Sequence, residues 1–147
     1  MSEAVANRIP CLQARVAGRD LLLPLRDLRE VLPAMSISLL PGRPRGIQGV
    51  VVHEGEFLPV LAWTDLPGLS VGNRKPQALA VLRLRLGLPL EAQCGVLDSN
   101  PETWVDPETT EPWQSWLLAM VPLDGKLVPV LDADRLLAVL RALRQQG

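Results

Sequence analysis

A segment near the middle of the chain returns in altered form near the C-terminus, and this repeat limits the possible folds more than any other feature. The first copy has two apolar runs, residues 47–52 and 57–63, separated by His53-Glu54-Gly55-Glu56. A glycine after an acidic residue supplies the positive φ that a tight turn between antiparallel strands needs. The segment therefore predicts a β-hairpin.

The second copy spans residues 123–136, with Asp124-Gly125 as its turn. Five identical residues stand 70 positions apart in the two copies: Gly55 and Gly125, Pro59 and Pro129, Val60 and Val130, Leu61 and Leu131, Leu66 and Leu136. Two unrelated hairpins could share an acid-Gly turn, but proline inside a strand is disfavoured except at edges and bulges. The repeat therefore predicts a duplicated unit.

Composition favours a small domain with its own core. The chain has 147 residues, of which 48% are hydrophobic and 21% charged, which fits one domain or two small subdomains that share a core. Its formal net charge of −1 argues against a nucleic-acid or anionic-membrane partner, because such partners select a basic surface. The 14 prolines and 11 glycines predict many short strands.

The termini and cysteines carry no targeting or metal-binding pattern. Residues 1–10 are expected to be flexible and lack a signal peptide, and no apolar run is long enough to span a membrane, so we expect a cytoplasmic protein without direct membrane insertion. Cys11 and Cys94 are isolated in apolar, strand-like contexts, which predicts two buried free thiols.

The first half is expected to contain a hairpin, a short helix and further strands. Residues 11–17 and 21–25 predict paired strands, and 36–40 another strand. Asp27 is the expected cap of a short helix with Leu28, Val31 and Leu32 on its apolar face. The loop-like residues 67–76 predict the boundary between the two units.

The second half repeats this layout. Strands are expected at 78–86 and 90–97 with a turn at 87–89, then an acidic arm at 98–112, strands at 117–121 and 127–131, and a final helix capped by Asp134. We expect Trp116 in the core and leave Trp104 and Trp113 open between core and contact surface. The helix should bury its leucines (Leu136, Leu137, Leu140, Leu143) and expose its arginines (Arg135, Arg141, Arg144).

No motif in the chain assembles a catalytic or cofactor site. The glycines of residues 41–49 lead into a strand rather than a helix, unlike a phosphate-binding loop. His53, the only histidine, is expected at a solvated hairpin tip, and Asp132 and Asp134 fit a helix cap. The sequence therefore favours a binding module without enzymatic activity, cofactor or metal, although a spatial triad leaves no trace in sequence.

Several short runs, in order along residues 11–137, resemble the CheW family of adaptor proteins from bacterial chemotaxis-like arrays. Leu28-Arg-Glu-Val31 looks like the family's V-x-E-I run, and the second-half D-G-x-x-x-x-L-L-D signature is similar to the segment from Asp124 to Leu137. Two further runs match with small spacing differences: Pro41, Pro44, Ile47, Gly49 and Val50, and then Gly55, Phe57, Pro59 and Val60.

The resemblance implies a mostly β fold of two small SH3-like five-stranded barrels, about 11–70 and 77–147, with a short helix after each first hairpin and a C-terminal helix. It implies a scaffold that does no chemistry and binds three kinds of partner: the regulatory domain of a CheA-like histidine kinase, the cytoplasmic tip of a chemoreceptor, and other CheW-like proteins. The partner-binding residues it implies are Leu28, Glu30, Val31, Ile47, Gly49, Val50, Glu54, Phe57 and Pro59.

The chain departs from the family pattern at the hairpin tip. Val52-His53-Glu54-Gly55 stands where the family has Asn-Leu-Arg-Gly, and Ala62 where it has Asp. Glu54 would then face Glu30 with like charge, unless a cation from Arg26, Arg29 or Arg45 intervenes. We hypothesise a specialised paralogue, from a type IV pilus rather than a flagellar two-component system. The alternatives are a CheW-like module outside receptor arrays and a ligand-binding or enzymatic β-barrel that uses His53 and the acidic arm.

Overall fold

Two antiparallel hairpins, 70 residues apart, set the pattern of the fold. The computed structural model describes residues 8–66, 75–107 and 112–146. The strands β5 (Ile47–His53) and β6 (Glu56–Leu61) start and end 70 positions before β10 (Leu117–Leu123) and β11 (Lys126–Leu131). Both pairs have a register shift near the start of their first strand. The predicted duplication is confirmed.

The two turns also match. Glu54 and Gly55 have φ values of 53° and 77°, and Asp124 and Gly125 have 50° and 77°. Positive φ at both central residues is the signature of the two-residue turn whose twist matches that of antiparallel strands. An acidic residue tolerates this conformation only at a cost, and glycine adopts it freely. The acid-Gly motif in the sequence therefore located both turns correctly.

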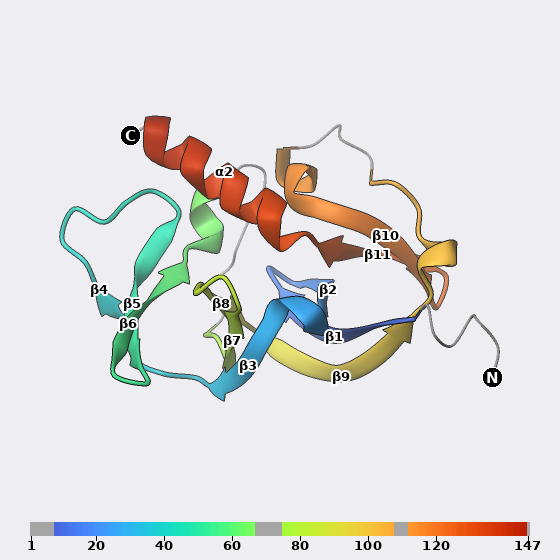
Figure 1. The fold of residues 1–147 in the computed structure, drawn as a ribbon, viewed down its shortest axis with the longest axis horizontal. Helices are drawn as coiled ribbons and strands as arrows, with labels where there is room; N and C mark the ends of the chain where they lie inside the picture. The colour runs from blue at the N-terminus through green and yellow to red at the C-terminus, as the bar shows by residue number, and fades with distance from the viewer. Residues whose placement is uncertain (1–7, 67–74, 108–111, 147) are drawn as a thin grey trace.

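The described strands form two sheets, and the helix α2 (Ala133–Gln146) lies across both of them (Figure 1). The five-stranded sheet has the order β10-β11-β2-β1-β9 and the six-stranded sheet the order β3-β7-β8-β6-β5-β4. The remaining strands are β1 (Ile9–Val16), β2 (Arg19–Pro24), β3 (Leu28–Pro33), β4 (Ser38–Leu39), β7 (Ala78–Leu82), β8 (Gly87–Leu90) and β9 (Ala92–Ser99). The mostly β fold with a C-terminal helix is as predicted. No helix in the described ranges has the length and apolar character needed to cross a bilayer.

Each sheet takes strands from both halves of the chain, so the sheets do not follow the expected subdomains 11–70 and 77–147. β2 pairs in parallel with β11 at Leu22 and Val130, and β8 pairs in parallel with β6 at Gly87 and Val60. The hairpin that opens each half, β1–β2 in the first and β7–β8 in the second, has the same apolar pattern. The pattern therefore does not show which of the later hairpins each one pairs with. The boundary expected at 67–76 falls mainly outside the described residues.

The main core lies between the sheets and is closed by α2. The rings of Trp63 and Trp116 meet in it, with centroids 5.8 Å apart and an interplanar angle of 44°. Leu136, Leu140 and Leu143 of α2 are buried against them, as predicted, whereas Leu137 is only partly buried. Smaller clusters cover the other faces of the sheets, around Leu22 and Val130 in one and around Leu58 and Val60 in the other. The helix arginines are exposed, as expected.

The prediction of a short helix from Asp27 to Leu32 is wrong. A single 3-10 turn covers Leu25–Asp27, and the chain then continues as β3. β3 pairs antiparallel with β7, whose five residues are all buried. Because buried backbone groups must be hydrogen-bonded, β7 requires a neighbour on each side, and this requirement outweighs the weak propensity of one helical turn. The second short helix implied after the other first hairpin is likewise absent from the described residues, since β8 leads directly into β9.

Other local predictions need correction. Gly87–Leu90 is a strand rather than a turn, and the chain reverses at residues 83–86 instead. Helix α2 is capped by Asp132, whose carboxylate accepts a 3.0 Å hydrogen bond from the Arg135 N–H, rather than by Asp134.

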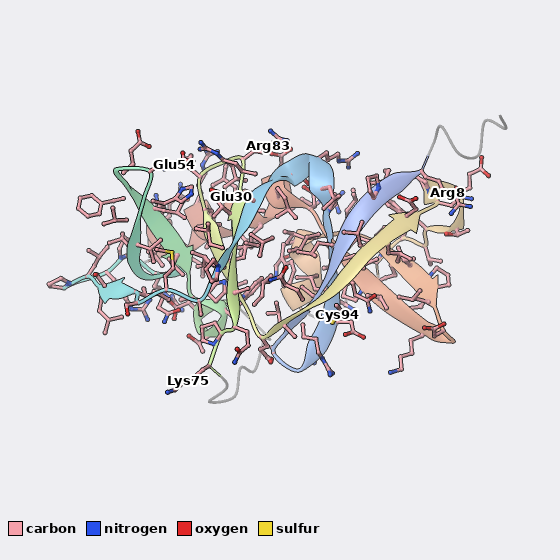
Figure 2. The ribbon with its side chains drawn as sticks, turned by 90° about the horizontal axis from the view of Figure 1, so that it is seen from below. Arg8, Glu30, Glu54, Lys75, Arg83 and Cys94 are labelled. Carbon is pink, nitrogen blue, oxygen red and sulfur yellow. The ribbon has the colours of Figure 1, made fainter. Side chains whose placement is uncertain are left out.

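Only one of the two cysteines is buried as predicted. Cys11 is buried, and burial raises the pKa of its thiol to about 11, but Cys94 is exposed on the edge strand β9 (Figure 2). Residues 93–96 of β9 are exposed on both faces of the strand, so Cys94 has no core to enter.

The sequence leaves open whether Trp104 and Trp113 lie in the core or on a contact surface. Trp104 is partly buried against the cluster around Leu22, and its indole N–H donates a 2.5 Å hydrogen bond to the Ser99 hydroxyl. It therefore closes the end of the five-stranded sheet. The side chain of Trp113 and residues 108–111 of the arm lie outside the described residues.

Gly49 is expected to be essential for the approach of β4. A Cβ atom at Gly49 would lie 2.3 Å from the Ser38 carbonyl oxygen and 2.8 Å from Cγ2 of Ile37. We therefore expect Gly49→Ala to reduce the free energy of unfolding by about 1–3 kcal/mol, as overpacking does, measured by urea denaturation. The counterpart in the second hairpin is Ala119, so Ala119→Gly is the matched control, with an expected loss of about 0.5–1 kcal/mol. A smaller loss for Gly49→Ala than for the control would contradict this reading.

Asp65 is expected to make stability depend on pH. The Arg43 guanidinium, 2.7 Å from its carboxylate, holds the pKa of Asp65 below its ordinary value, with a smaller contribution from the Gly46 N–H and partial opposition from burial. A carboxyl with a lowered folded-state pKa stabilises the protein above its unfolded pKa of about 3.9, and this contribution disappears as pH falls through the folded-state value.

Asp65→Asn should therefore be less stable than the unmodified protein at pH 7, and the difference should shrink steadily below about pH 4. Denaturation curves at pH 7, 4 and 3 measure this directly. A difference that stays constant across these pH values would show that the carboxylate charge does not contribute.

Candidate functional site

The outer face of the β5–β6 hairpin carries an exposed apolar surface. Val50 is paired with Pro59 and Val52 with Phe57, and these four side chains, here called the hairpin patch, point to the same side because strand residues alternate. Val52 is 60% and Phe57 74% exposed. Monomeric proteins rarely group large apolar side chains in this way without a partner that covers them. The hairpin patch is therefore a candidate protein-binding surface.

The inner face of the same hairpin is locked into the protein. Val51, Leu58 and Val60 are buried against Leu79 and Val81 of β7 in one apolar cluster. The hairpin patch thus stands on a rigid support, which lowers the entropy lost when a partner binds.

The structure separates the sequence-predicted binding residues into two groups. Val50, Phe57 and Pro59 lie in the hairpin patch, and Val31 is half-buried on β3. Leu28 and Ile47 are 7% and 3% exposed and belong to the main core, so they offer little surface to a partner, although Ile47 lines the floor of the groove described below. Gly49 lies under β4 and has a packing role.

Val52 is absent from the binding residues that the sequence predicts, although it lies in the hairpin patch. The uniformly apolar run of residues 47–52 assigns no face to its members. Burial alternates along β5 from the buried Ile47, which places Val51 and His53 on the buried face and Val50 and Val52 on the other face. This alternation was therefore the signal that could have found Val52.

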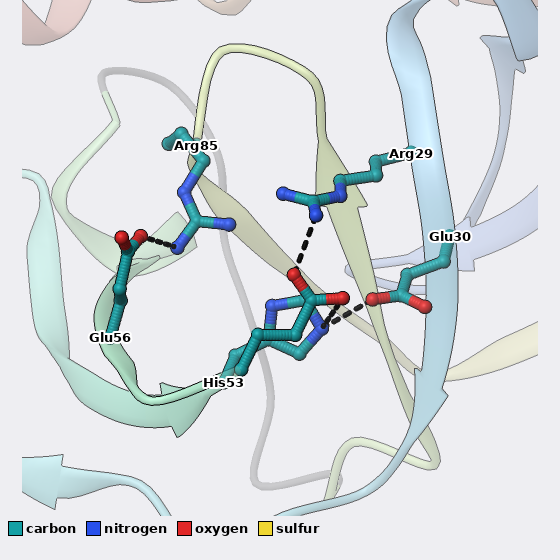
Figure 3. A network of polar contacts seen from close by, with 6 residues as sticks. Arg29, Glu30, His53, Glu56 and Arg85 are labelled. Carbon is teal, nitrogen blue, oxygen red and sulfur yellow. Dashed lines mark hydrogen bonds and ion pairs between the residues drawn. The ribbon is translucent and has the colours of Figure 1, made fainter.

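A polar network joins the tip of the hairpin to β3 (Figure 3). His53, the last residue of β5, faces inward and is only 8% exposed, so the expectation of a solvated histidine is wrong. Its Nε2 atom contacts the carboxylate of Glu30 on β3. The alternation that exposes Val52 turns His53 toward β3, which accounts for this placement.

Glu54 is paired as well. A guanidinium nitrogen of Arg29 lies 2.5 Å from its Oε2 atom, so Arg29, rather than Arg26 or Arg45, is the cation beside Glu54. Glu30 and Glu54 lie at the same edge of the molecule (Figure 2), and Glu54 Oε1 is 4.0 Å from Nε2 of His53. Glu56, the first residue of β6, forms a further ion pair with Arg85, with 3.0 Å between Oε2 and the guanidinium nitrogen. Exposed pairs of this kind each contribute about 0–1 kcal/mol, so the network orients side chains more than it stabilises the fold.

The chemistry of this network suits ion pairing and cation binding. In the described parts of the chain, the polar contacts of the His53 ring are with carboxylates, and its Nδ1 atom has no hydrogen-bond partner. A nucleophile activated by histidine would have to donate a hydrogen bond to the ring. The geometry therefore gives no support to acyl transfer at His53.

A groove of about 210 Å³ lies between α2 and the β7–β8 turn. Its floor is apolar, with Ile47, Pro59 and Leu140, and its rim carries Arg85, Arg141 and Arg144. An aliphatic side chain flanked by carboxylates would fit such a lining.

Comparison with known proteins agrees with this fold. A family model described as the CheW-like domain matches residues 10–141. The crystal structure of the scaffolding protein TtCheW from Thermoanaerobacter tengcongensis superposes with a TM-score of 0.76, covering 86% of this chain and 85% of that chain at 19% sequence identity. No curated protein sequence matches. Because the family model covers most of the sequence, the chain belongs to the family of CheW-like domains.

Proposed function

We propose that the protein is a non-catalytic scaffold that couples chemoreceptors to a CheA-like histidine kinase in a chemotaxis-like signalling array. Membership of the CheW-like family supports a scaffold role in general. A cytoplasmic location beside membrane-bound receptor arrays follows from the proposal, and other CheW-like proteins are further candidate partners.

The observation that carries the proposal is the hairpin patch. Phe57 is 74% exposed at its centre, on a strand whose opposite face is buried. A large aromatic side chain on a rigid support is the typical anchor of a protein interface. We assign the hairpin patch to the regulatory domain of the kinase.

The proposal extends to the residues that contact the chemoreceptor and to the motility system that the array controls. Glu30, Val31 and Glu54 remain candidates for receptor contact, because they lie along β3 and the hairpin tip and are at least partly exposed. Glu54 stands where the family pattern has an arginine, and the exposed carboxylate of Glu56 lies on the same hairpin. A partner whose binding surface requires a cation at this position would therefore be repelled. This supports a specialised paralogue, and we propose a type IV pilus-linked system that controls twitching motility.

A CheW-like interaction module outside receptor arrays is the second candidate function. It would use the same surface and differ only in its partners, because a fold does not define function. The enzymatic alternative has no such support, since the polar contacts of the His53 ring within the described residues are with carboxylates.

Replacing Phe57 should weaken kinase binding without unfolding the protein. We expect Phe57→Ser to raise the Kd for the regulatory domain of the kinase encoded nearest to this gene at least tenfold, measured by calorimetry, because an anchor residue contributes more than about 1.4 kcal/mol. Leu127→Ser is the matched control: it occupies the equivalent position in the second hairpin and is 54% exposed. Its effect should be less than twofold.

Two results would count against the proposal. Equal weakening by both variants would show that the hairpin patch has no special role. Absence of binding by the folded, unmodified protein would redirect the search toward receptor tips and other CheW-like proteins, and would favour the second candidate function.

A further inference from the structure

Three potential metal ligands meet at the tip of the β5–β6 hairpin, and they come from different parts of the local structure. Glu30 lies on β3, His53 ends β5 and Glu54 begins the turn. One ligand atom from each lies within 4.8 Å of the others. We propose that Glu30, His53 and Glu54 form a binding site for a divalent transition-metal ion, with Zn²⁺ as the ion of best fit.

The ligand types favour zinc and similar ions over magnesium or calcium. An imidazole nitrogen combined with two carboxylate oxygens is a borderline donor set of the kind that Zn²⁺, Co²⁺ and Ni²⁺ accept. Mg²⁺ and Ca²⁺ require oxygen ligands throughout. The site is therefore not a generic acidic cluster, because the buried imidazole selects the class of metal.

The surroundings hold two of the ligands in place. His53 is 8% exposed, so its ring is fixed by packing while Nε2 faces the carboxylates. Arg29 binds Oε2 of Glu54 at 2.5 Å and leaves Oε1 on the side of the imidazole, 4.0 Å from Nε2. Ligating carboxylates are typically oriented by such outer hydrogen bonds, which raise the affinity of a site.

Metal binding requires only small movements of exposed side chains. Zinc bonds of about 2.0–2.1 Å place neighbouring ligand atoms about 3.3 Å apart in a tetrahedron. The direct contact between His53 and Glu30 must therefore open, and Glu54 Oε1 must approach. The side chains of Glu30 and Glu54 are 37% and 53% exposed. The Glu30 carboxylate can therefore rotate, Glu54 Oε1 can shift toward the imidazole while Oε2 keeps its contact with Arg29, and water can fill the remaining coordination position.

One feature limits the expected affinity. A metal-bound histidine usually donates its other ring N–H to an acceptor, and loss of that partner weakens binding about 10–100-fold. Nδ1 of His53 has no partner among the described residues. We therefore expect a Kd on the order of micromolar rather than the much tighter binding of structural zinc sites.

The test is calorimetric titration of tag-free, chelator-treated protein with Zn²⁺, repeated with Mg²⁺. We expect one Zn²⁺ per chain and no measurable Mg²⁺ binding. His53→Leu and Glu54→Gln should each weaken Zn²⁺ binding at least tenfold. Glu56→Gln is the matched control, since Glu56 lies on the same hairpin, is exposed and pairs with Arg85. It should bind Zn²⁺ as the unmodified protein does.

Co²⁺ provides a second measurement, because its visible absorption reports the coordination geometry of the bound ion. Circular dichroism verifies that each variant is folded, and Glu54→Gln alone decides the matter if His53→Leu fails to fold, because Glu54 lies in an exposed turn. Lack of Zn²⁺ binding would overturn the proposal, as would unchanged binding in Glu54→Gln. The proposal does not depend on the scaffold function, and either can fail without the other.

Discussion

The fold depends on two parallel strand contacts that join hairpins from opposite halves of the chain. β2 meets β11 at Leu22 and Val130, and β8 meets β6 at Val60 and Gly87. Each contact places a first hairpin beside a second hairpin that is distant in sequence, so neither half can complete a sheet without the other. The main core then forms between the two sheets, with Trp63 and Trp116 at its centre and α2 over it. Cooperative folding of the whole domain is the natural consequence.

The duplicated hairpins differ where their neighbours differ. In the first hairpin, Gly49 allows β4 to pass close by. The second hairpin has Ala119 at the same place, and among the described residues an isolated bridge between Val105 and Met120 takes the place of such a strand. Phe57 and Leu127 likewise occupy equivalent exposed positions. The turn and the shared proline (Pro59 and Pro129) thus account for the common backbone of the two hairpins. The positions at which their residues differ are those that contact different neighbours.

Local signals in the sequence predicted much of this structure, and non-local pairing accounts for the errors. The acid-Gly turns, the buried Trp116 and the amphipathic α2 all depend on neighbouring residues, and they were predicted correctly. Residues 28–33 carry a helical pattern but form β3, because β7 needs a partner there. His53 was expected in solvent because it adjoins a turn, yet strand alternation turns it inward. No local signal in the sequence indicated that β2 pairs with β11 and β8 with β6, because these strands are far apart in the chain.

The unusual residues at the hairpin tip form a compensated set. The resemblance to the CheW family pattern implies leucine at the position of His53 and arginine at that of Glu54. In this chain the cation beside Glu54 is Arg29 on β3, and the imidazole of His53 contacts Glu30. Two like charges therefore remain close without repelling β3 from the hairpin, because each has a partner. The hairpin is therefore attached to β3 even though its tip exposes the carboxylates of Glu54 and Glu56. Under the proposed function, the charge of this tip affects the choice of partner more than it affects the fold.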